Sequence, residues 1–172
     1  MYYATIKEVD IANGIGVRVS LFVSGCTHKC PGCFNEIAWN FKYGNEFTQD
    51  TIDYLLNALK PAHIRGLSLL GGEPMEPVNQ RGLLPLLQQF HATYPDKTVW
   101  CYSGYVLEDL LEGGRAHCEV TDELLRYLDI LVDGPFIMAK KDIRLKFRGS
   151  TNQRIIDMKE TIKQNQIVLW DE

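Results

Sequence analysis

Residues 21–33, LFVSGCTHKCPGC, join a short apolar run to a cluster of cysteines. The apolar run Leu21-Phe22-Val23 predicts the end of a buried strand, because an uninterrupted apolar segment is typical of a strand covered on both faces. Three cysteines follow this strand with the spacing Cys-x3-Cys-x2-Cys. A loop rich in ligand residues directly after a strand is typical of α/β folds.

The spacing of Cys26, Cys30 and Cys33 favours an iron–sulfur cluster of the cubane [4Fe-4S] type. Three thiolates on one short loop can bind three of the irons. No further cysteine follows nearby to bind the last iron. Ordinary electron-carrying clusters use four cysteines, so the pattern predicts an open iron that binds a small molecule and carries out chemistry on it.

Two other interpretations of these cysteines stay open on the spacing alone. Structural zinc needs four ligands in a closed tetrahedron, and the fourth would be His28, Cys101 or Cys118. His28 is crowded between two of the thiols. Alternatively, Cys30 and Cys33 form a Cys-x-x-Cys pair, the arrangement of redox-active thiols, and the first cysteine then has no part.

The length and composition indicate the number of domains and the cellular compartment. A chain of 172 residues is most simply a single domain, 1–172, and buries roughly 70% of its unfolded surface without disulfides. There is no N-terminal signal pattern and no apolar run of membrane-spanning length. We therefore expect a cytoplasmic protein with reduced thiols.

The charge distribution bears on the partners. The net charge of −4 gives no broad attraction to nucleic acid or to a membrane, and we expect neither as a partner. The basic stretch 140–148 is a local exception. It is either a solvated surface segment or a docking site for an acidic partner or ligand.

Short apolar runs alternate with helical patterns along the chain. The predicted strands are 18–23, 66–70, 97–102 and 129–132, and the predicted helices are 48–60, 78–94, 106–112 and 121–128. Thr48 is the expected N-cap of the first helix, and Pro85 is expected to begin or kink the second. Near the end, 155–164 is predicted to be helical and 167–170 to form a strand.

This alternation predicts an α/β fold with a mostly parallel sheet covered by helices. Right-handed crossovers would coil such units into an open or partial (β/α) barrel. A complete eight-unit barrel needs about 250 residues, so this chain can build only part of one.

Glycines and polar residues follow each of four predicted strands. The four motifs are Ser24-Gly25-Cys26, Gly71-Gly72-Glu73-Pro74, Ser103-Gly104-Tyr105 and Asp133-Gly134-Pro135. The carboxyl ends of parallel strands meet at one edge, which is where α/β folds bind ligands. We therefore expect these motifs to face a single site, although each of the last two alone is typical of an ordinary strand-to-helix turn.

The Gly71-Gly72-Glu73-Pro74 motif has a further chemical use. Two glycines allow a close approach of the backbone or a positive φ. Strand-end carbonyls and the charge of Glu73 would suit a ligand ammonium group. By contrast, Gly14-Ile15-Gly16 lacks the rest of a dinucleotide fingerprint, because position 19 is valine, and it is interpreted as a turn before the first strand.

The cysteine loop and the Gly-Gly-Glu-Pro motif together resemble the radical S-adenosylmethionine enzymes. Among these, the chain is most similar to the family that activates anaerobic ribonucleoside-triphosphate reductases. The resemblance extends over most of the chain, to about residue 153. The stretches that carry it are Asn13-Gly14-x-Gly16, residues 21–26, residues 30–35 (CPGCFN), residues 131–134 (LVDG) and residues 148–153 (RGSTNQ).

This resemblance implies a partial barrel and one [4Fe-4S] cluster that binds S-adenosylmethionine. It implies reductive cleavage of that ligand, and a glycyl radical in the large subunit of the reductase. The cluster would be reduced by an external one-electron donor of the flavodoxin or ferredoxin type, since no second cysteine cluster is present. An open side of the barrel would admit a loop of the partner. Activation of another glycyl-radical enzyme, or radical chemistry on a small molecule, is the alternative within this class.

Site residues follow from the resemblance only where a motif matches. The three cysteines of the loop would be the cluster ligands. Gly71, Gly72 and Glu73 would line the site of the methionine amino group, and Pro74 would shape the turn. The resemblance also implies contacts of Gly32, Cys33 and Phe34 with S-adenosylmethionine. Weaker candidates for ligand, pocket or partner contacts are Tyr102, Tyr105, Asp133 and the segment Arg148-Gly149-Ser150.

Overall fold

The computed structural model describes residues 1–33 and 36–171. In this part of the chain the sheet has seven strands in the order β3-β1-β2-β4-β5-β6-β7. Their bounds are β1 Tyr2–Asp10, β2 Val17–Val23, β3 Asn45–Glu46, β4 Ile64–Gly71, β5 Thr98–Ser103, β6 Ile130–Asp133 and β7 Arg154–Asp157. The helices are α1 Gln49–Ala58, α2 Pro77–Thr93, α3 Leu107–Leu110, α4 Thr121–Tyr127 and α5 Met158–Gln164.

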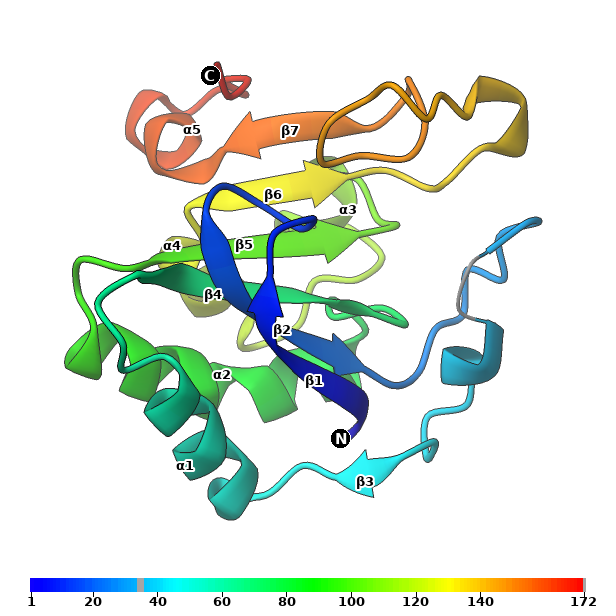
Figure 1. Cartoon of the computed structure of the whole chain (residues 1–172). Coiled ribbons are helices and arrows are strands. Elements are labelled where there is room, and N and C mark those ends of the chain that lie inside the picture. Colours follow the sequence, from blue (N-terminus) through cyan, green and yellow to red (C-terminus); the bar gives the residue numbers. More distant parts are fainter. Residues whose placement is uncertain (34–35, 172) are drawn as a thin grey trace.

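The four central strands are parallel and the outer pairs are antiparallel. Strand β2 pairs with β4, β4 with β5, and β5 with β6 in parallel, whereas β1 and β7 run against their neighbours. Figure 1 shows β4, β5 and β6 ending on the same side of the molecule. The α/β class and its parallel centre are thus confirmed. The finer expectation of a partial barrel stays a prediction.

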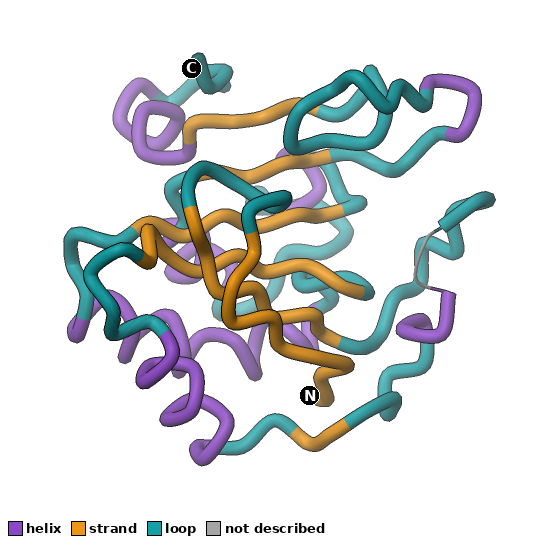
Figure 2. The backbone as a smooth tube through the Cα atoms, in the orientation of Figure 1, coloured by secondary structure: helices purple, strands orange, loops and turns teal. Residues whose placement is uncertain are grey.

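The helices cover one face of the sheet (Figure 2). Alternate residues of the central strands, such as Leu21, Leu69 and Leu131, point to this face and are fully buried against α1, α2 and α4. A second, smaller cluster forms on the other face around Trp100, Ile130 and Val132. The alternation follows from the period of two in a strand, and it leaves the second face open to loops rather than helices.

A buried arginine joins the amino ends of three strands. Arg18 is 1% exposed, and its guanidinium donates to Ser68 Oγ at 2.8 Å, to Leu67 O at 3.0 Å and to Thr98 O at 2.8 Å. It also donates to Ile15 O at 3.0 Å, in the turn between β1 and β2. Burial lowers the pKa of Arg18 to about 10, and the hydrogen bonds compensate for the lost hydration of the cation.

Most predicted elements are present. The strands predicted at 18–23, 66–70, 97–102 and 129–132 correspond to β2, β4, β5 and β6, and the predicted helices correspond to α1 to α4. Thr48 is the N-cap of α1. Helix α2 begins at Pro77, so Pro85 lies inside it and does not begin it. Gly14 and Gly16, with φ of 116° and 80°, form a turn directly before β2, which confirms the turn, but β2 is the second strand and not the first.

The predictions are wrong at both ends of the chain. Strand β1 was not predicted, because its mixed charges hide a half-exposed strand that pairs with β2. Residues 155–157 belong to β7 rather than to a helix, since Ile155 and Ile156 pair with β6. Asp157 then caps α5 by accepting from the Glu160 amide. The strand predicted at 167–170 is reduced to a single bridge between Leu169 and Ile156.

In residues 1–33 and 36–171 we find no helix that is both long and apolar enough to cross a lipid bilayer.

Leu69→Ala is expected to lower the free energy of unfolding by about 2–5 kcal/mol, because it leaves a cavity where β4 packs on the helices. Leu169→Ala is the matched control, since this leucine is 60% exposed and should change stability by no more than about 0.5 kcal/mol. Urea denaturation followed by circular dichroism measures both. Equal stability losses in the two variants would contradict the assigned core.

Candidate functional site

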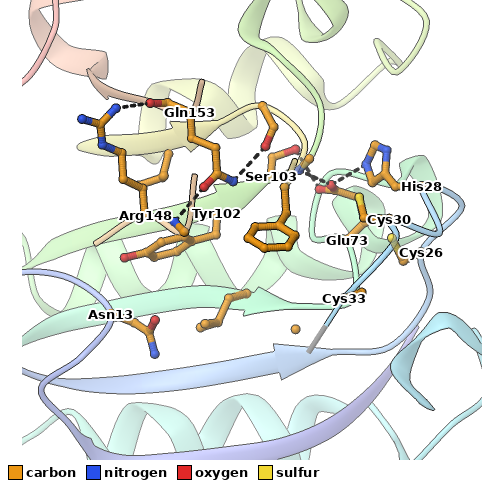
Figure 3. Close-up of a pocket in the computed structure, with 18 of the residues that line it drawn as sticks. Asn13, Cys26, His28, Cys30, Cys33, Glu73, Tyr102, Ser103, Arg148 and Gln153 are labelled. Atoms are coloured by element: carbon orange, nitrogen blue, oxygen red, sulfur yellow. Dashed lines mark hydrogen bonds and ion pairs between the residues drawn. The ribbon is translucent and has the colours of Figure 1, made fainter. Parts of the chain in front are cut away.

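A cavity of about 480 Å³ lies at the carboxyl ends of the central strands, on the face away from the helices. Figure 3 shows its two ends. The cysteine loop, His28 and Glu73 lie at one end, and Asn13, Tyr102, Arg148 and Gln153 lie at the other. Its volume lies in the range typical of small-molecule and cofactor sites.

The cysteine loop is held at its start by backbone hydrogen bonds. The Gly25 amide donates to Ala38 O at 2.6 Å, and the Cys26 amide donates to Trp39 O at 3.3 Å. The next residue is held by a side chain: Thr27 donates through its amide and its hydroxyl to Glu76 Oε1, at 3.1 and 2.7 Å. Cys26 is therefore positioned by hydrogen bonds of its own amide and of the residues before and after it.

The glycines of the Gly-Gly-Glu-Pro motif allow this loop and the cysteine loop to touch. Gly71 has a φ of 115°. The Gly72 amide donates to Val23 O at 2.8 Å, and the Glu73 amide donates to Gly25 O at 2.7 Å. A Cβ added at Gly72 would lie 2.7 Å from Gly25 O. The close backbone approach expected of these glycines is thus to the cysteine loop.

Glu73 is 1% exposed and accepts four hydrogen bonds from the chain itself. Oε1 lies 2.6 Å from the Gly104 amide and 2.7 Å from His28 Nε2. Oε2 lies 2.8 Å from both the Met75 amide and Ser103 Oγ. A carboxylate has about four acceptor positions, so these donors fix its orientation within the site and stabilise its charge.

His28 links the cysteine loop to the segment that follows β5. Its imidazole lies against the ring of Tyr105 with centroids 4.4 Å apart, and it bonds Glu73. The side chain is 10% exposed. Gly104 gives it room, because a Cβ there would lie 2.7 Å from His28 Cδ2.

The three thiols line the same cavity. Burial raises the pKa of Cys26 to about 11 and also raises the pKa of Cys30, so these two thiols favour the protonated form and metal binding would release their protons. Among the described residues, no three His, Cys, Asp or Glu side chains converge on one metal ion. A cubane binds each thiolate at a different iron and needs no such convergence, so the donor set fits a cluster.

The cysteines proposed as a fourth zinc ligand do not line this cavity. Cys101 lies fully buried in the core beneath the helices. Cys118 bonds Gln80 and Thr121, at 3.5 Å in each case.

At the other end of the cavity, Tyr102 Oη is buried and, among the described residues, has no hydrogen-bond partner. Burial raises the pKa of this phenol, so it stays protonated and can donate to a ligand. Arg148 is held beside it by a hydrogen bond from Nη1 to Gln153 O at 2.6 Å. This end therefore offers hydrogen-bond donors, and the apolar side chains Phe22 and Leu70 also line the cavity.

The structure brings together most of the predicted site residues. Gly71, Gly72 and Glu73 line the cavity with the cysteines. Pro74 is buried in the turn that follows. Gly32 is exposed and lies under Met138 rather than at the cavity wall. Phe34 lies outside the described residues.

Of the weaker candidates, Arg148 and Gly149 line the cavity, whereas Ser150 is buried behind it. Asp133 has a structural role, since it accepts from the Leu107 amide at 2.7 Å and pairs with Arg154.

Sequence reasoning missed two residues, Glu76 and Asn79, that hold the two loops together. Glu76 binds Thr27, and Asn79 Nδ2 donates to Ser24 O at 3.0 Å and to Glu73 O at 2.9 Å. Glu76 and Asn79 are 5% and 1% exposed. Their only sequence signal is that polar residues recur at the start of a helix directly after the motif.

An α/β fold with a cysteine loop at the strand ends defines a class of iron–sulfur protein, and residues 12–156 match the family model described as "4Fe-4S single cluster domain". The chain is 43% identical over 157 residues to the anaerobic ribonucleoside-triphosphate reductase-activating protein of Vibrio cholerae, covering 90% of this chain and 97% of the relative. The same protein of Haemophilus influenzae is 41% identical, with coverages of 90% and 97%. That of phage T4 is 38% identical, with coverages of 90% and 93%.

This chain belongs to the family of anaerobic ribonucleoside-triphosphate reductase-activating proteins.

Gly72→Ala is expected to separate the cysteine loop from the Glu73 loop, because both atoms nearest to the added methyl group are backbone oxygens. We expect a stability loss of about 1–3 kcal/mol and reduced iron incorporation, measured by iron analysis after anaerobic reconstitution. Gly113→Ala is the control: its φ of 85° makes alanine unfavourable, but nothing lies within 4 Å. It should cost about 1–2 kcal/mol and leave iron incorporation unchanged. Full iron incorporation by Gly72→Ala would count against the assigned contact.

Proposed function

We propose that this protein activates the anaerobic ribonucleoside-triphosphate reductase by reductive cleavage of S-adenosylmethionine at one [4Fe-4S] cluster, which generates a glycyl radical in the large reductase subunit. The observation that carries the proposal is the single cavity lined by three thiols of one loop and by Glu73, in a chain 43% identical to a protein named for this activation.

Cys26, Cys30 and Cys33 would hold the cluster. When bound, the cluster and S-adenosylmethionine would supply the electron transfer and the radical that removes a hydrogen atom from the target glycine. The protein's own share is binding, orientation and exclusion of water.

Glu73 would attract the amino group of the ligand by its charge rather than by a hydrogen bond, since its four acceptor positions are already occupied. Its charge is buried and held by four donors, so it presents a fixed negative potential beside the thiols. A ligand ammonium would be attracted to this carboxylate and to the strand-end carbonyl groups of Gly71 and Gly72, which is the role proposed for this motif. Pro74 would shape the turn. Of the residues proposed to contact S-adenosylmethionine next to the third cysteine, Cys33 lines the cavity and would lie close to the ligand, whereas Gly32 does not line it.

The apolar wall would exclude water from the reacting centre. Phe22, Leu70, Val132 and Phe136 line the cavity between its two polar ends. A radical in such a site is protected from side reactions with solvent. At the far end, the unpartnered Tyr102 hydroxyl would donate to a polar group of the ligand.

One external electron donor of the flavodoxin or ferredoxin type would reduce the cluster. We propose that residues 1–172 act as a single cytoplasmic domain of the radical S-adenosylmethionine type, with an open side that admits the loop of the reductase.

Replacing Cys26, Cys30 or Cys33 by alanine should lower S-adenosylmethionine cleavage by more than about 100-fold, since loss of even an outer-shell group at a metal site costs about 10–100-fold. The assay is anaerobic reconstitution, dithionite reduction and quantification of 5'-deoxyadenosine. Electron paramagnetic resonance with and without the ligand gives an independent readout. Cys118→Ala is the matched control, and cleavage should persist in it.

The other interpretations of the cysteines give different results. Stoichiometric zinc without iron after anaerobic purification would favour a zinc-binding adaptor. Disulfide turnover that needs Cys30 and Cys33 but not Cys26 would favour a redox protein. Normal cleavage with no radical in this reductase, but a radical in another glycyl-radical enzyme, would keep the chemistry and change the target.

A further inference from the structure

Residues 135–149, which we call the rim segment, lie between β6 and β7 (Figure 1) and border the cavity. Phe136, Leu145 and Phe147 line the cavity from the rim segment. The segment also reaches the cysteine loop, because a Cβ on Gly32 would lie 2.0 Å from Met138 Cε. Any macromolecule that inserts a loop into the cavity from this side must contact the rim segment.

The backbone of the rim segment is held in place. The Thr151 amide donates to Lys140 O at 2.9 Å, and the Asp142 amide donates to Gly149 O at 3.2 Å. Gln153 Oε1 accepts from the Gly149 amide at 2.8 Å. The ring of Phe147 packs on Trp100 with centroids 5.2 Å apart. These contacts preorganise the surface, which lowers the entropy lost when a partner binds.

The outward side of the segment is apolar and basic. Ile143 is 90% exposed and Met138 is 50% exposed. Residues 140–148 contain five basic side chains and one acidic one, a net charge of +4 in a chain whose net charge is −4. Lys140, Arg144 and Lys146 are exposed. Exposed apolar side chains surrounded by charge on an ordered loop are typical of an interaction site.

We propose that the rim segment is the docking surface for the reductase and that it binds an acidic segment of the large subunit. This inference rests on the proposed function and adds the surface and its chemistry. Charge complementarity would steer the two proteins together, and burial of Ile143 and Met138 would hold the partner's loop next to the cavity. Lys140, Ile143 and Lys146 do not line the cavity, so they can change docking without changing the ligand site.

The test compares the rim segment with an exposed surface on α5. The rim variant combines Lys140→Glu, Ile143→Ser and Lys146→Glu. The control variant combines Ile162→Ser and Lys163→Glu on α5, where Ile162 is 46% exposed. Each reconstituted protein is titrated anaerobically with the large subunit of the anaerobic reductase of the same organism, at low and moderate salt. Cleavage of S-adenosylmethionine by dithionite-reduced protein without reductase is measured in parallel.

The rim variant should weaken the Kd for the reductase by about tenfold or more and flatten its salt dependence. The control variant should bind like the wild type, and both should retain cleavage of S-adenosylmethionine. Lys146→Glu alone, a single exposed change, should flatten the salt dependence even if the triple variant does not fold.

Three results would overturn the docking proposal. Wild-type affinity of the rim variants, with normal glycyl radical formation, would place the reductase elsewhere and leave the proposed function intact. Loss of ligand cleavage in both rim variants would assign the segment to the ligand site instead. Wild-type protein that cleaves the ligand but neither binds the reductase nor forms its radical would reject both the docking proposal and the proposed target.

Discussion

The contact between the ends of β2 and β4 is the constraint on which the site depends. These strands are parallel and in register up to Val23 and Gly71, and the pairing continues past the sheet through hydrogen bonds from Gly72 to Val23 and from Glu73 to Gly25. Only a residue without a Cβ fits between these backbones at position 72. The thiols and the carboxylate are therefore brought together by main-chain geometry, which is more rigid than a contact between long side chains.

Two buried carboxylates organise the residues around this contact. Glu73 collects donors from the cysteine loop, from its own loop and from the end of β5. Glu76 binds Thr27 and lies near the Tyr105 hydroxyl, at 3.3 Å. A buried carboxylate without these donors would be strongly unfavourable, so the loops and the charges support one another. The site is thus preorganised by the chain before any ligand binds.

Strands with a strong local apolar pattern could be predicted from the sequence, whereas strands that depend on pairing with a neighbour could not. The central strands are nearly continuous apolar runs, so β2, β4, β5 and β6 could be predicted. Strand β1 contains charged and exposed residues such as Lys7 and Glu8, and its pairing with β2 makes it a strand. Residues 155–157 follow the same rule, because the edge of β6 selects an extended conformation there and tertiary context overrides local propensity.

The sequence by itself determined the chemistry that the chain can carry: three thiols at a spacing set by one short loop, and a glycine-rich turn ending in a carboxylate, both directly after apolar strands. Local spacing suffices for this because the ligands of one loop are neighbours along the chain. Only the tertiary structure decided what surrounds that chemistry. Glu76, Asn79, Tyr102 and the basic rim segment are distant from the cysteines in sequence, and they meet the site because parallel pairing gathers the strand ends at one edge of the sheet.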